Sequence, residues 1–225
     1  MNQQLLGKTQ DHLTKWNSNL VHMELVDPLS KLNKDAQQVG IDLAIASGFR
    51  SYERQKLIWN EKITGKRQLL DSESNPLNIA DLSPNEILFA ILKWSAIPGF
   101  SRHHWGCDFD IFDKKALPKN YKLQLIPAEY YKDGIFSKLT NWLDSLNDSQ
   151  FIRPYQKDTG GVAIEPWHIS YRPVAKKYEQ ELSLDSFINE IKNSSLLLKQ
   201  EILNNSDEIF FTFVSQHCKS IQYSS

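Results

Sequence analysis

Histidines and carboxylates gather in two short segments of the chain. One segment, residues 101–110, holds two histidines and two aspartates, and the other begins at Glu165 and reads Glu-Pro-Trp-His. A catalytic zinc ion typically takes three His, Asp or Glu ligands and leaves a fourth position for water. His103, Asp110 and His168 could supply such a set. Glu165 would then take the proton as that water, whose pKa zinc lowers to roughly 7, attacks a carbonyl.

The spacing of these residues supports a shared site only in part. If Gly106 begins a strand, residues 108 and 110 share one face, and the histidines lie on the loop before it. Residues 165 and 168 would face opposite sides of a regular strand. We therefore expect the intervening proline, which lacks the N–H of a strand ladder, to bend the chain. The spacing alone is compatible with two interpretations, a metal site formed by both segments or two ordinary polar segments.

Helices and strands are expected to alternate along the chain and to position both segments. Ser51 could cap one helix, and the Ser-Pro-Asn-Glu run that starts at Ser83 is typical of a capping box. The expected helices are 20–39, 51–65, 83–94 and 135–146, and the expected strands are 41–46, 107–112 and 161–169. After Pro173 the apolar spacing is helical. Strands interleaved with helices at irregular spacings predict an α+β fold with a small, mostly antiparallel sheet flanked by helices and a helical C-terminal extension.

The composition describes a soluble globular chain and excludes several classes of function. Of the 225 residues, 40% are hydrophobic and 24% are charged, and the formal net charge is -1. A near-neutral chain has no overall field to attract nucleic acid or an anionic membrane, and no run approaches the about 18 apolar residues of a membrane span. Two cysteines, Cys107 and Cys218, cannot build a disulfide framework.

Four ordered motifs resemble the zinc D-alanyl-D-alanine carboxypeptidases of the VanY type. The family patterns S-x-H-x-x-G-x-A-x-D and E-x-W-H are similar to residues 101–110 and 165–168, with one departure. The run from Ser47 to Tyr52, with Gln55, resembles the family block S-G-[YF]-R-S, and a Thr-Gly-Gly turn precedes the second motif. The resemblance covers about residues 40 to 172.

The resemblance implies a role for each residue that matches a family motif. His103, Asp110 and His168 match the zinc ligands of the family, and Glu165 matches its catalytic base. Arg50 matches an arginine that binds substrate and polarises the scissile carbonyl. Ser101 matches a serine at the substrate-binding edge. A guanidinium can donate to an oxyanion as charge develops there. Trp167 is expected to pack between base and ligand, and Tyr155 to line the pocket or simply to pack.

Asp108 stands where the family pattern has alanine. It could accept a hydrogen bond that orients a ligand histidine, replace Asp110 as the ligand, or contact a substrate amine, and we favour the first role. The family register leaves His104 outside the ligand set. Cys107, which alternates away from the metal, is expected in the core.

The function that the resemblance implies is that of a zinc-dependent D-alanyl-D-alanine carboxypeptidase. Such an enzyme would bind one zinc ion per chain and hydrolyse the terminal peptide bond of bacterial cell-wall stem peptides. An L,D-carboxypeptidase, an L-Ala-D-Glu endopeptidase, and a non-catalytic zinc-stabilised module that binds peptidoglycan or a protein stay open as alternatives. The presence of Glu165 together with Arg50 favours an enzyme over a decayed site.

The domain organisation follows from the extent of the resemblance. We expect a zinc peptidase domain over residues 1–172, which includes the N-terminal helix, and a helical extension over residues 173–225 packed on it. The chain is expected to act as a monomer on peptidoglycan stem peptides, without nucleic acid. This substrate class predicts the cell envelope or periplasm, whereas the leaderless N-terminus as written predicts the cytoplasm or delivery by lysis.

Overall fold

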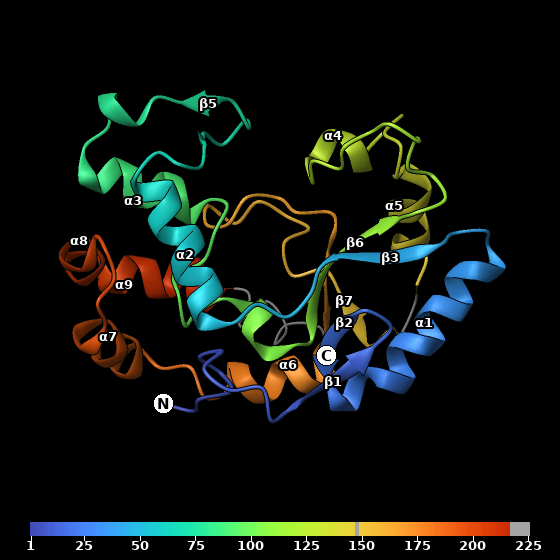
Figure 1. Cartoon of the computed structure of the whole chain (residues 1–225), viewed down its shortest axis with the longest axis horizontal. Helices are drawn as coiled ribbons and strands as arrows, with labels where there is room; N and C mark the ends of the chain where they lie inside the picture. Colours follow the sequence, from blue (N-terminus) through green and yellow to red (C-terminus); the bar gives the residue numbers. More distant parts are fainter. Residues whose placement is uncertain (147–148, 217–225) are drawn as a thin grey trace.

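The computed structural model describes residues 1–146 and 149–216, in which helices surround small antiparallel sheets (Figure 1). The strands are β1 (Leu13–Trp16), β2 (Asn19–His22), β3 (Leu43–Ser47), β4 (Leu69–Leu70), β5 (Pro76–Leu77), β6 (Asp108–Asp113), β7 (Phe151–Ile152) and β8 (His168–Tyr171). The α-helices are α1 (Val26–Gln38), α2 (Tyr52–Ile63), α3 (Pro84–Leu92), α4 (Pro127–Tyr130), α5 (Ser137–Asp144), α6 (Arg172–Glu179), α7 (Leu184–Asn193), α8 (Lys199–Asn204) and α9 (Ser206–Ile209). The 3-10 helices are η1 (Met23–Leu25), η2 (Ile79–Asp81) and η3 (Arg102–Trp105). A π-helix, η4, spans Phe210–Val214.

The largest sheet among the described residues has four strands in the order β3-β6-β8-β7, and every neighbouring pair is antiparallel. β6 pairs with β3 on one side and β8 on the other, so Ser47 and His168 are the cross-strand neighbours of Asp110. The predicted α+β fold, with a small antiparallel sheet flanked by helices, is therefore confirmed. The pairing of β6 with β8 also brings together the two segments that are rich in histidine and carboxylate.

Two hydrophobic cores stabilise the chain. The first lies around the four-stranded sheet and includes Phe109 and Ile169. The second joins α2 and α3 to helices that follow α6, with Trp59, Phe187 and Phe210 buried inside it. Figure 1 shows α2, α3, α7, α8 and α9 together at one end of the molecule, and β3 with α1 and α5 at the other. The domain boundary between residues 172 and 173 stays a prediction.

Local capping interactions explain where the helices beside the site begin. The Ser51 hydroxyl accepts a hydrogen bond from the backbone N–H of Arg54 and starts α2. At α3, Ser83 and Glu86 form the predicted capping box, with Pro84 in the first turn. Both predicted helix starts are confirmed, because side-chain oxygens satisfy backbone N–H groups that have no partner inside the helix.

Gly106 permits a close approach between η3 and the N-terminal hairpin of β1 and β2. Its φ of +68° lies in the left-handed region that favours glycine, and a Cβ at this position would lie 2.4 Å from Leu13 Cδ2. The backbone of the hairpin contacts the same residue, since His22 N donates to Gly106 O at 2.7 Å. The hairpin therefore supports the turn that leads from His103 into β6.

The predicted helix over residues 20–39 is wrong at its start. Residues 19–22 form β2, which pairs with β1 around a turn in which Asn17 has a φ of +50°. Asparagine adopts this left-handed conformation more readily than most residues. Local strand pairing therefore replaces the first helical turn, and α1 begins only at Val26.

The predicted strand over residues 161–169 is wrong over most of its length, since β8 begins only at its end. The backbone N–H of Ala163 donates to Lys93 O at 2.9 Å, and that of Glu165 donates to Tyr155 O at 3.0 Å. These bonds hold the segment as a loop against other parts of the chain. Within the described residues, no helix has the length and apolar character that crossing a bilayer requires.

Candidate active site

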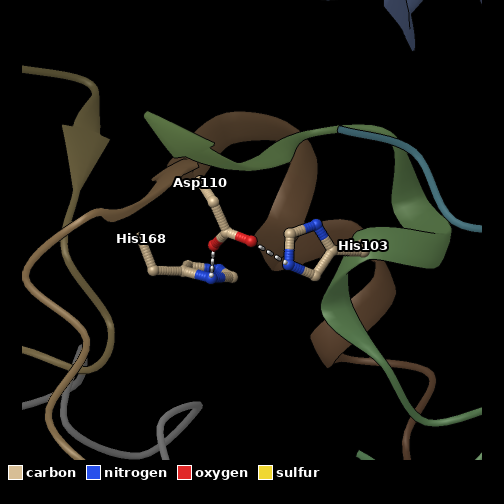
Figure 2. Close-up of side chains that lie close together, drawn as sticks. All are labelled: His103, Asp110 and His168. Carbon is tan, nitrogen blue, oxygen red and sulfur yellow. Dashed lines mark ion pairs between the residues drawn. The ribbon is translucent and has the colours of Figure 1, made fainter. Parts of the chain in front are cut away.

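Three side chains from separate elements converge beside the four-stranded sheet: His103 from η3, Asp110 from β6 and His168 from β8 (Figure 2). His103 Nε2 lies 3.5 Å from Asp110 Oδ2, and His168 Nδ1 lies 3.2 Å from Asp110 Oδ1. One ligand atom from each residue lies within 4.8 Å of the other two, and all three residues are buried. We call these residues the His/Asp/His group. Its two imidazoles and one carboxylate are the donor types that a catalytic zinc ion takes.

Two buried atoms of the His/Asp/His group, Asp110 Oδ1 and His168 Nδ1, form no hydrogen bond within the described residues. Their polar contacts are ion-pair distances of 3.2 Å to each other and, for His168 Nδ1, of 3.5 Å to Glu165 Oε2. Buried polar atoms are normally paired, because removing them from water without a partner costs free energy. A cation coordinated by both atoms would satisfy them, so the donor set fits a zinc ion.

His103 presents a lone pair to the group. Its Nδ1 lies 3.0 Å from the carbonyl oxygen of Gly48, which can only accept, so Nδ1 carries the hydrogen and Nε2 faces Asp110. Burial lowers the pKa of His103 to about 4, although Asp110 acts in the opposite direction. The ring is therefore neutral at physiological pH, as a metal ligand must be.

His168 is held from the side opposite Asp110. Its Nε2 lies 3.0 Å from Asp108 Oδ1, while Nδ1 faces Asp110 and Glu165. Burial alone would lower the pKa of His168, but the contacts with these three carboxylates raise it well above its usual value. A metal ion at Nδ1 would take the place of the proton that the carboxylates otherwise favour.

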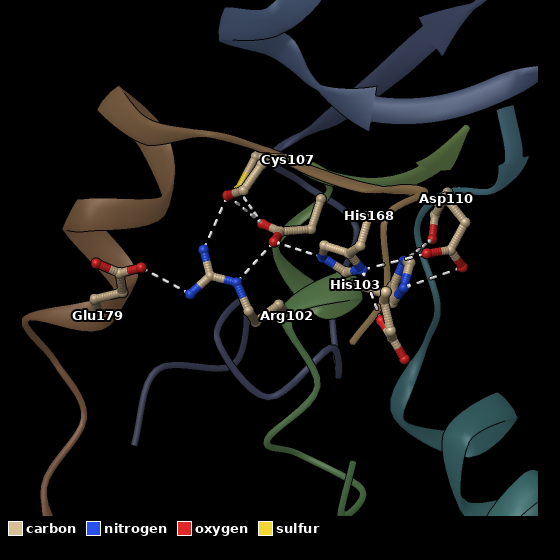
Figure 3. Close-up of polar contacts among 10 residues, drawn as sticks. Arg102, His103, Cys107, Asp110, His168 and Glu179 are labelled. Carbon is tan, nitrogen blue, oxygen red and sulfur yellow. Dashed lines mark hydrogen bonds and ion pairs between the residues drawn. The ribbon is translucent and has the colours of Figure 1, made fainter. Parts of the chain in front are cut away.

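Asp108 belongs to a polar network with Arg102, which extends from there to Glu179. Figure 3 labels Arg102, Cys107 and Glu179 of this network beside the His/Asp/His group. Arg102 donates to Asp108 Oδ1 at 2.7 Å, to Glu179 Oε1 at 2.7 Å and to Ser170 Oγ at 2.9 Å. Ser170 Oγ donates in turn to Asp108 Oδ2 at 3.0 Å, and the Cys107 thiol also contacts this oxygen. Burial works in the opposite direction, but the charge of Arg102 holds the pKa of Asp108 well below its usual range. Asp108 is thus an anion whose oxygens are fixed by several partners.

Glu165 lies beside the group because the chain turns sharply before β8. The backbone N–H of His168 donates to Glu165 O at 3.1 Å, which confirms the predicted bend at Pro166. The turn leaves Glu165 Oε2 3.5 Å from His168 Nδ1. Burial raises the pKa of Glu165, although His168 and Arg50 act against this shift. A carboxylate with a raised pKa is suited to accept a proton during a reaction.

Arg50 follows β3 and is fixed by two side chains. Its Nη1 donates to Gln55 Oε1 at 2.8 Å, and its Nη2 donates to Ser47 Oγ at 3.1 Å. Asp110 and Glu165 are the nearby anions, and they oppose the lowering of the pKa of Arg50 that burial causes. The guanidinium therefore stays charged next to the His/Asp/His group.

His104 fixes the backbone of Arg50 instead of joining the His/Asp/His group. Its Nε2 accepts a hydrogen bond from the Gly99 N–H at 3.0 Å, so Nδ1 carries the hydrogen and donates to Arg50 O. Burial lowers the pKa of His104 to about 3, which keeps the ring neutral. Sequence reasoning placed His104 outside the ligand set but did not find this contact.

The His/Asp/His group lines a cavity of about 390 Å³. The other predicted site residues that line it are Arg50, Ser101, Tyr155, Glu165 and Trp167. Tyr155 packs its ring edge-on against His168, with 4.7 Å between the ring centroids, and Trp167 packs against Tyr130 at 5.5 Å. Tyr155 therefore both lines the cavity and packs, and Trp167 is 4% exposed in the first core. The volume is in the range that holds small ligands.

Three residues of the polar network were missed by sequence reasoning, namely Arg102, Ser170 and Glu179. They match no motif, and the contacts between them join η3, β8 and the end of α6. The available signal was Asp108 itself, because a carboxylate on a buried strand requires a cation nearby. Cys107 is buried, as predicted.

Comparisons by sequence and by structure find similar proteins. The profile of the VanY family, described as D-alanyl-D-alanine carboxypeptidase, matches residues 18–174. An uncharacterized protein of Haemophilus influenzae is 36% identical over 121 residues, which cover 52% of this chain and 92% of that protein. A D-alanyl-D-alanine carboxypeptidase of Enterococcus faecalis is 27% identical over 183 residues, which cover 77% of this chain and 57% of that protein. The fold is similar to that of VanYB in complex with D-alanine-D-alanine, with a TM-score of 0.51 and 24% identity over 79% of this chain and 87% of that chain.

The match to the family profile extends over more than half of the chain. It includes every residue of the His/Asp/His group, together with Arg50 and Glu165. The helices after α6 lie beyond it. The chain therefore belongs to the VanY family, which is described as a family of D-alanyl-D-alanine carboxypeptidases.

Proposed function

We propose that this protein is a zinc-dependent D-alanyl-D-alanine carboxypeptidase that removes the last residue of a peptidoglycan stem peptide. The observation that carries the proposal is the position of Glu165 beside the His/Asp/His group, in one cavity with Arg50. Membership of the VanY family and the similarity to the Enterococcus faecalis carboxypeptidase support the choice of bond.

The site contains the groups that peptide hydrolysis requires. Zinc bound by His103, Asp110 and His168 would supply a Lewis acid that lowers the pKa of water and polarises a carbonyl. Glu165 accepts a proton from the water that attacks the carbonyl carbon, and it returns that proton to the leaving amine as the C–N bond breaks. Arg50 donates to the carbonyl oxygen while negative charge collects there.

The alternatives within hydrolysis differ only in the bond that is cut. An L,D-carboxypeptidase would remove the last residue of a tetrapeptide stem, and an endopeptidase would cut between L-Ala and D-Glu.

A non-catalytic module would bind a stem without cleaving it. The position of Glu165 beside the His/Asp/His group and the fixed guanidinium of Arg50 favour turnover over binding alone.

The test is incubation of the zinc-loaded protein with tripeptide, tetrapeptide and pentapeptide stems, followed by mass spectrometry. We expect the pentapeptide to lose one D-Ala and the shorter stems to stay intact. Loss of the last residue of the tetrapeptide would instead identify an L,D-carboxypeptidase, and cleavage after L-Ala an endopeptidase. If no stem is cleaved, the proposed enzymatic function is wrong.

A variant of the proposed base separates metal binding from chemistry. Glu165→Ala is expected to keep its zinc, as measured by elemental analysis, and to lose hydrolysis by about 100-fold or more, because proton transfer by a positioned side chain contributes about that much. Glu53→Gln, at an exposed position of α2, is the matched control and should behave like the wild type. Full activity of Glu165→Ala would contradict the mechanism.

A further inference from the structure

Residues beyond the family match line the cavity that holds the His/Asp/His group. The VanY profile ends at residue 174. Even so, Leu182, Phe213 and Val214 line the same cavity as His168. Phe213 and Val214 belong to η4, which is a π-helical turn, a form found frequently at functional sites. The helices after α6 therefore supply part of the cavity wall.

The position of η4 is fixed by the loop that precedes Glu165. Gln216 Nε2 donates to the carbonyl oxygen of Thr159 at 2.7 Å. A Cβ placed on Gly161 would lie 2.2 Å from Thr212 O, so only glycine allows the two backbones to approach this closely. Both contacts hold η4 against the segment that carries the proposed base.

Aromatic contacts set the orientation of η4. Phe210 is 5% exposed and packs against Phe187 of α7, with 5.8 Å between ring centroids. Phe213 packs against Phe89 of α3 at 6.0 Å and also lines the cavity. Phe211, in the same turn, is 46% exposed. The anchoring of Phe210 and Phe213 thus presents one aromatic ring of η4 to the cavity and another to solvent.

The part of the wall that η4 completes is apolar. Other apolar residues that line the cavity are Leu92, Ile97, Phe100 and Val162. A wall of carbon atoms favours an apolar group of the ligand, because a polar group would lose its hydrogen bonds to water without replacement. Its side chains also limit the size of the group that can enter.

We propose that Phe213 and Val214 contact the small apolar side chain of the residue next to the scissile bond and so select alanine over larger residues. This inference rests on the proposed function, since it names the part of the peptide that the C-terminal helices recognise. The substrate class is a stem peptide with a methyl side chain beside the bond that is cut. η4 would then determine specificity from outside the family domain.

The experiment compares peptide series in which either the last or the penultimate residue is D-Ala, D-Val or D-Leu. Wild-type protein should prefer D-Ala at the position that the wall contacts. Phe213→Ala, which enlarges the cavity, should raise kcat/KM for the D-Val or D-Leu peptide relative to D-Ala by about 10-fold or more, since each methylene in such a pocket is worth about that much. Phe211→Ala is the matched control and should keep the wild-type preference.

Zinc content and the melting temperature show whether each variant is folded. If Phe213→Ala does not fold, Val214→Phe gives the converse test, because it narrows the cavity and should raise KM even for D-Ala. If the wild type cleaves D-Ala stems and the folded Phe213 and Val214 variants keep its selectivity, this inference is wrong and the proposed function stands. Wild-type protein that cleaves no peptide would instead overturn the proposed function.

Discussion

Asp108 Oδ1 and His168 Nε2 lie 3.0 Å apart across the pairing of β6 with β8, while the other ring nitrogen of His168 faces Asp110. The carboxylate fixes the tautomer as well as the ring orientation, because Nε2 must carry the hydrogen and Nδ1 is left for a metal. The motif that residues 101–110 resemble has alanine where this chain has Asp108. The chain therefore holds its histidine by a contact that alanine could not provide.

Replacing this carboxylate should weaken metal binding without abolishing it. We expect Asp108→Ala to lower zinc affinity about 10- to 100-fold, because the His168 ring loses the acceptor that orients it. Competition with a chromogenic chelator measures the change. Asp133→Ala, at an exposed position, is the matched control. Equal zinc affinity of the Asp108 variant and the wild type would show that Asp108 does not orient the ligand.

Asp108→Ala should also lower the free energy of unfolding, because Arg102 loses a buried carboxylate partner. Removing one partner of a buried ion pair typically costs about 3–5 kcal/mol, whereas replacing both with apolar residues is often neutral. We therefore expect Asp108→Ala combined with Arg102→Met and Glu179→Leu, which removes all three paired charges, to recover part of the stability in urea unfolding of metal-free protein. Zinc affinity should stay weak in this combined variant. If zinc affinity recovers together with stability, the loss of zinc is instead caused by general destabilisation.

Loss of either proposed histidine ligand should remove the metal. His103→Ala and His168→Ala each leave two protein ligands, so we expect bound zinc to fall from about one per chain towards zero at micromolar protein concentration. Elemental analysis of the purified variants after dialysis measures the stoichiometry. His22→Asn, which changes a histidine outside the cavity, should keep its zinc. If both ligand variants keep one zinc ion per chain, the assignment of His103 and His168 as ligands is wrong.

The His/Asp/His group could be predicted from the sequence because each of its residues lies within a short motif. Asp108 and Asp110 lie two residues apart on β6 and so share one face of the strand, and His103 lies in η3, just before β6. Pro166 marked the bend that turns Glu165 towards His168. These are local relationships, which spacing and backbone chemistry determine.

Contacts between distant segments could not be predicted in the same way. The ion pair of Arg102 with Glu179 depends on how α6 packs against η3, and no periodicity in the sequence encodes that packing. The predicted helix over residues 20–39 included most of β2, because the helical spacing of the apolar residues in α1 does not show that β2 pairs with β1. The place of Phe213 in the cavity wall likewise depends on the second core.

The hydrogen bonds of His104 predict an effect on catalysis that does not involve the metal. His104→Phe leaves the Gly99 N–H and the Arg50 carbonyl without their partner, which costs about 1–3 kcal/mol for each buried group left unpaired. Because the Arg50 backbone is then free to shift, we expect kcat to fall more than KM changes, with zinc content unaltered. His104→Gln, which retains a donor and an acceptor, should restore part of the rate. Loss of zinc in His104→Phe would point instead to a structural effect on His103.

The N-terminal hairpin should make the protein less stable in acid. Burial lowers the pKa of His22 from 6.5 to about 4, His12 and Lys177 act in the same direction, and Glu24 opposes them. The ring centroids of His12 and His22 lie only 5.6 Å apart, so a charge on one disfavours a charge on the other. Between pH 6.5 and about 4, the unfolded chain binds a proton at His22 that the folded chain does not. The free energy of unfolding therefore decreases as the pH falls through this window, by at most about 1.4 kcal/mol per pH unit for one group.

His22→Asn isolates this contribution to acid sensitivity. The His22 ring accepts a hydrogen bond from Glu24 N at 3.2 Å, and an asparagine side chain can accept the same bond without titrating. Urea unfolding of metal-free wild type and variant at pH 7.5, 6.5, 5.5 and 4.5 measures the difference. We expect the variant to lose less stability than the wild type between pH 6.5 and 4.5, with a constant offset above pH 7, where His22 is neutral in both states. Parallel stability curves over the whole range would show that His22 does not cause the acid sensitivity.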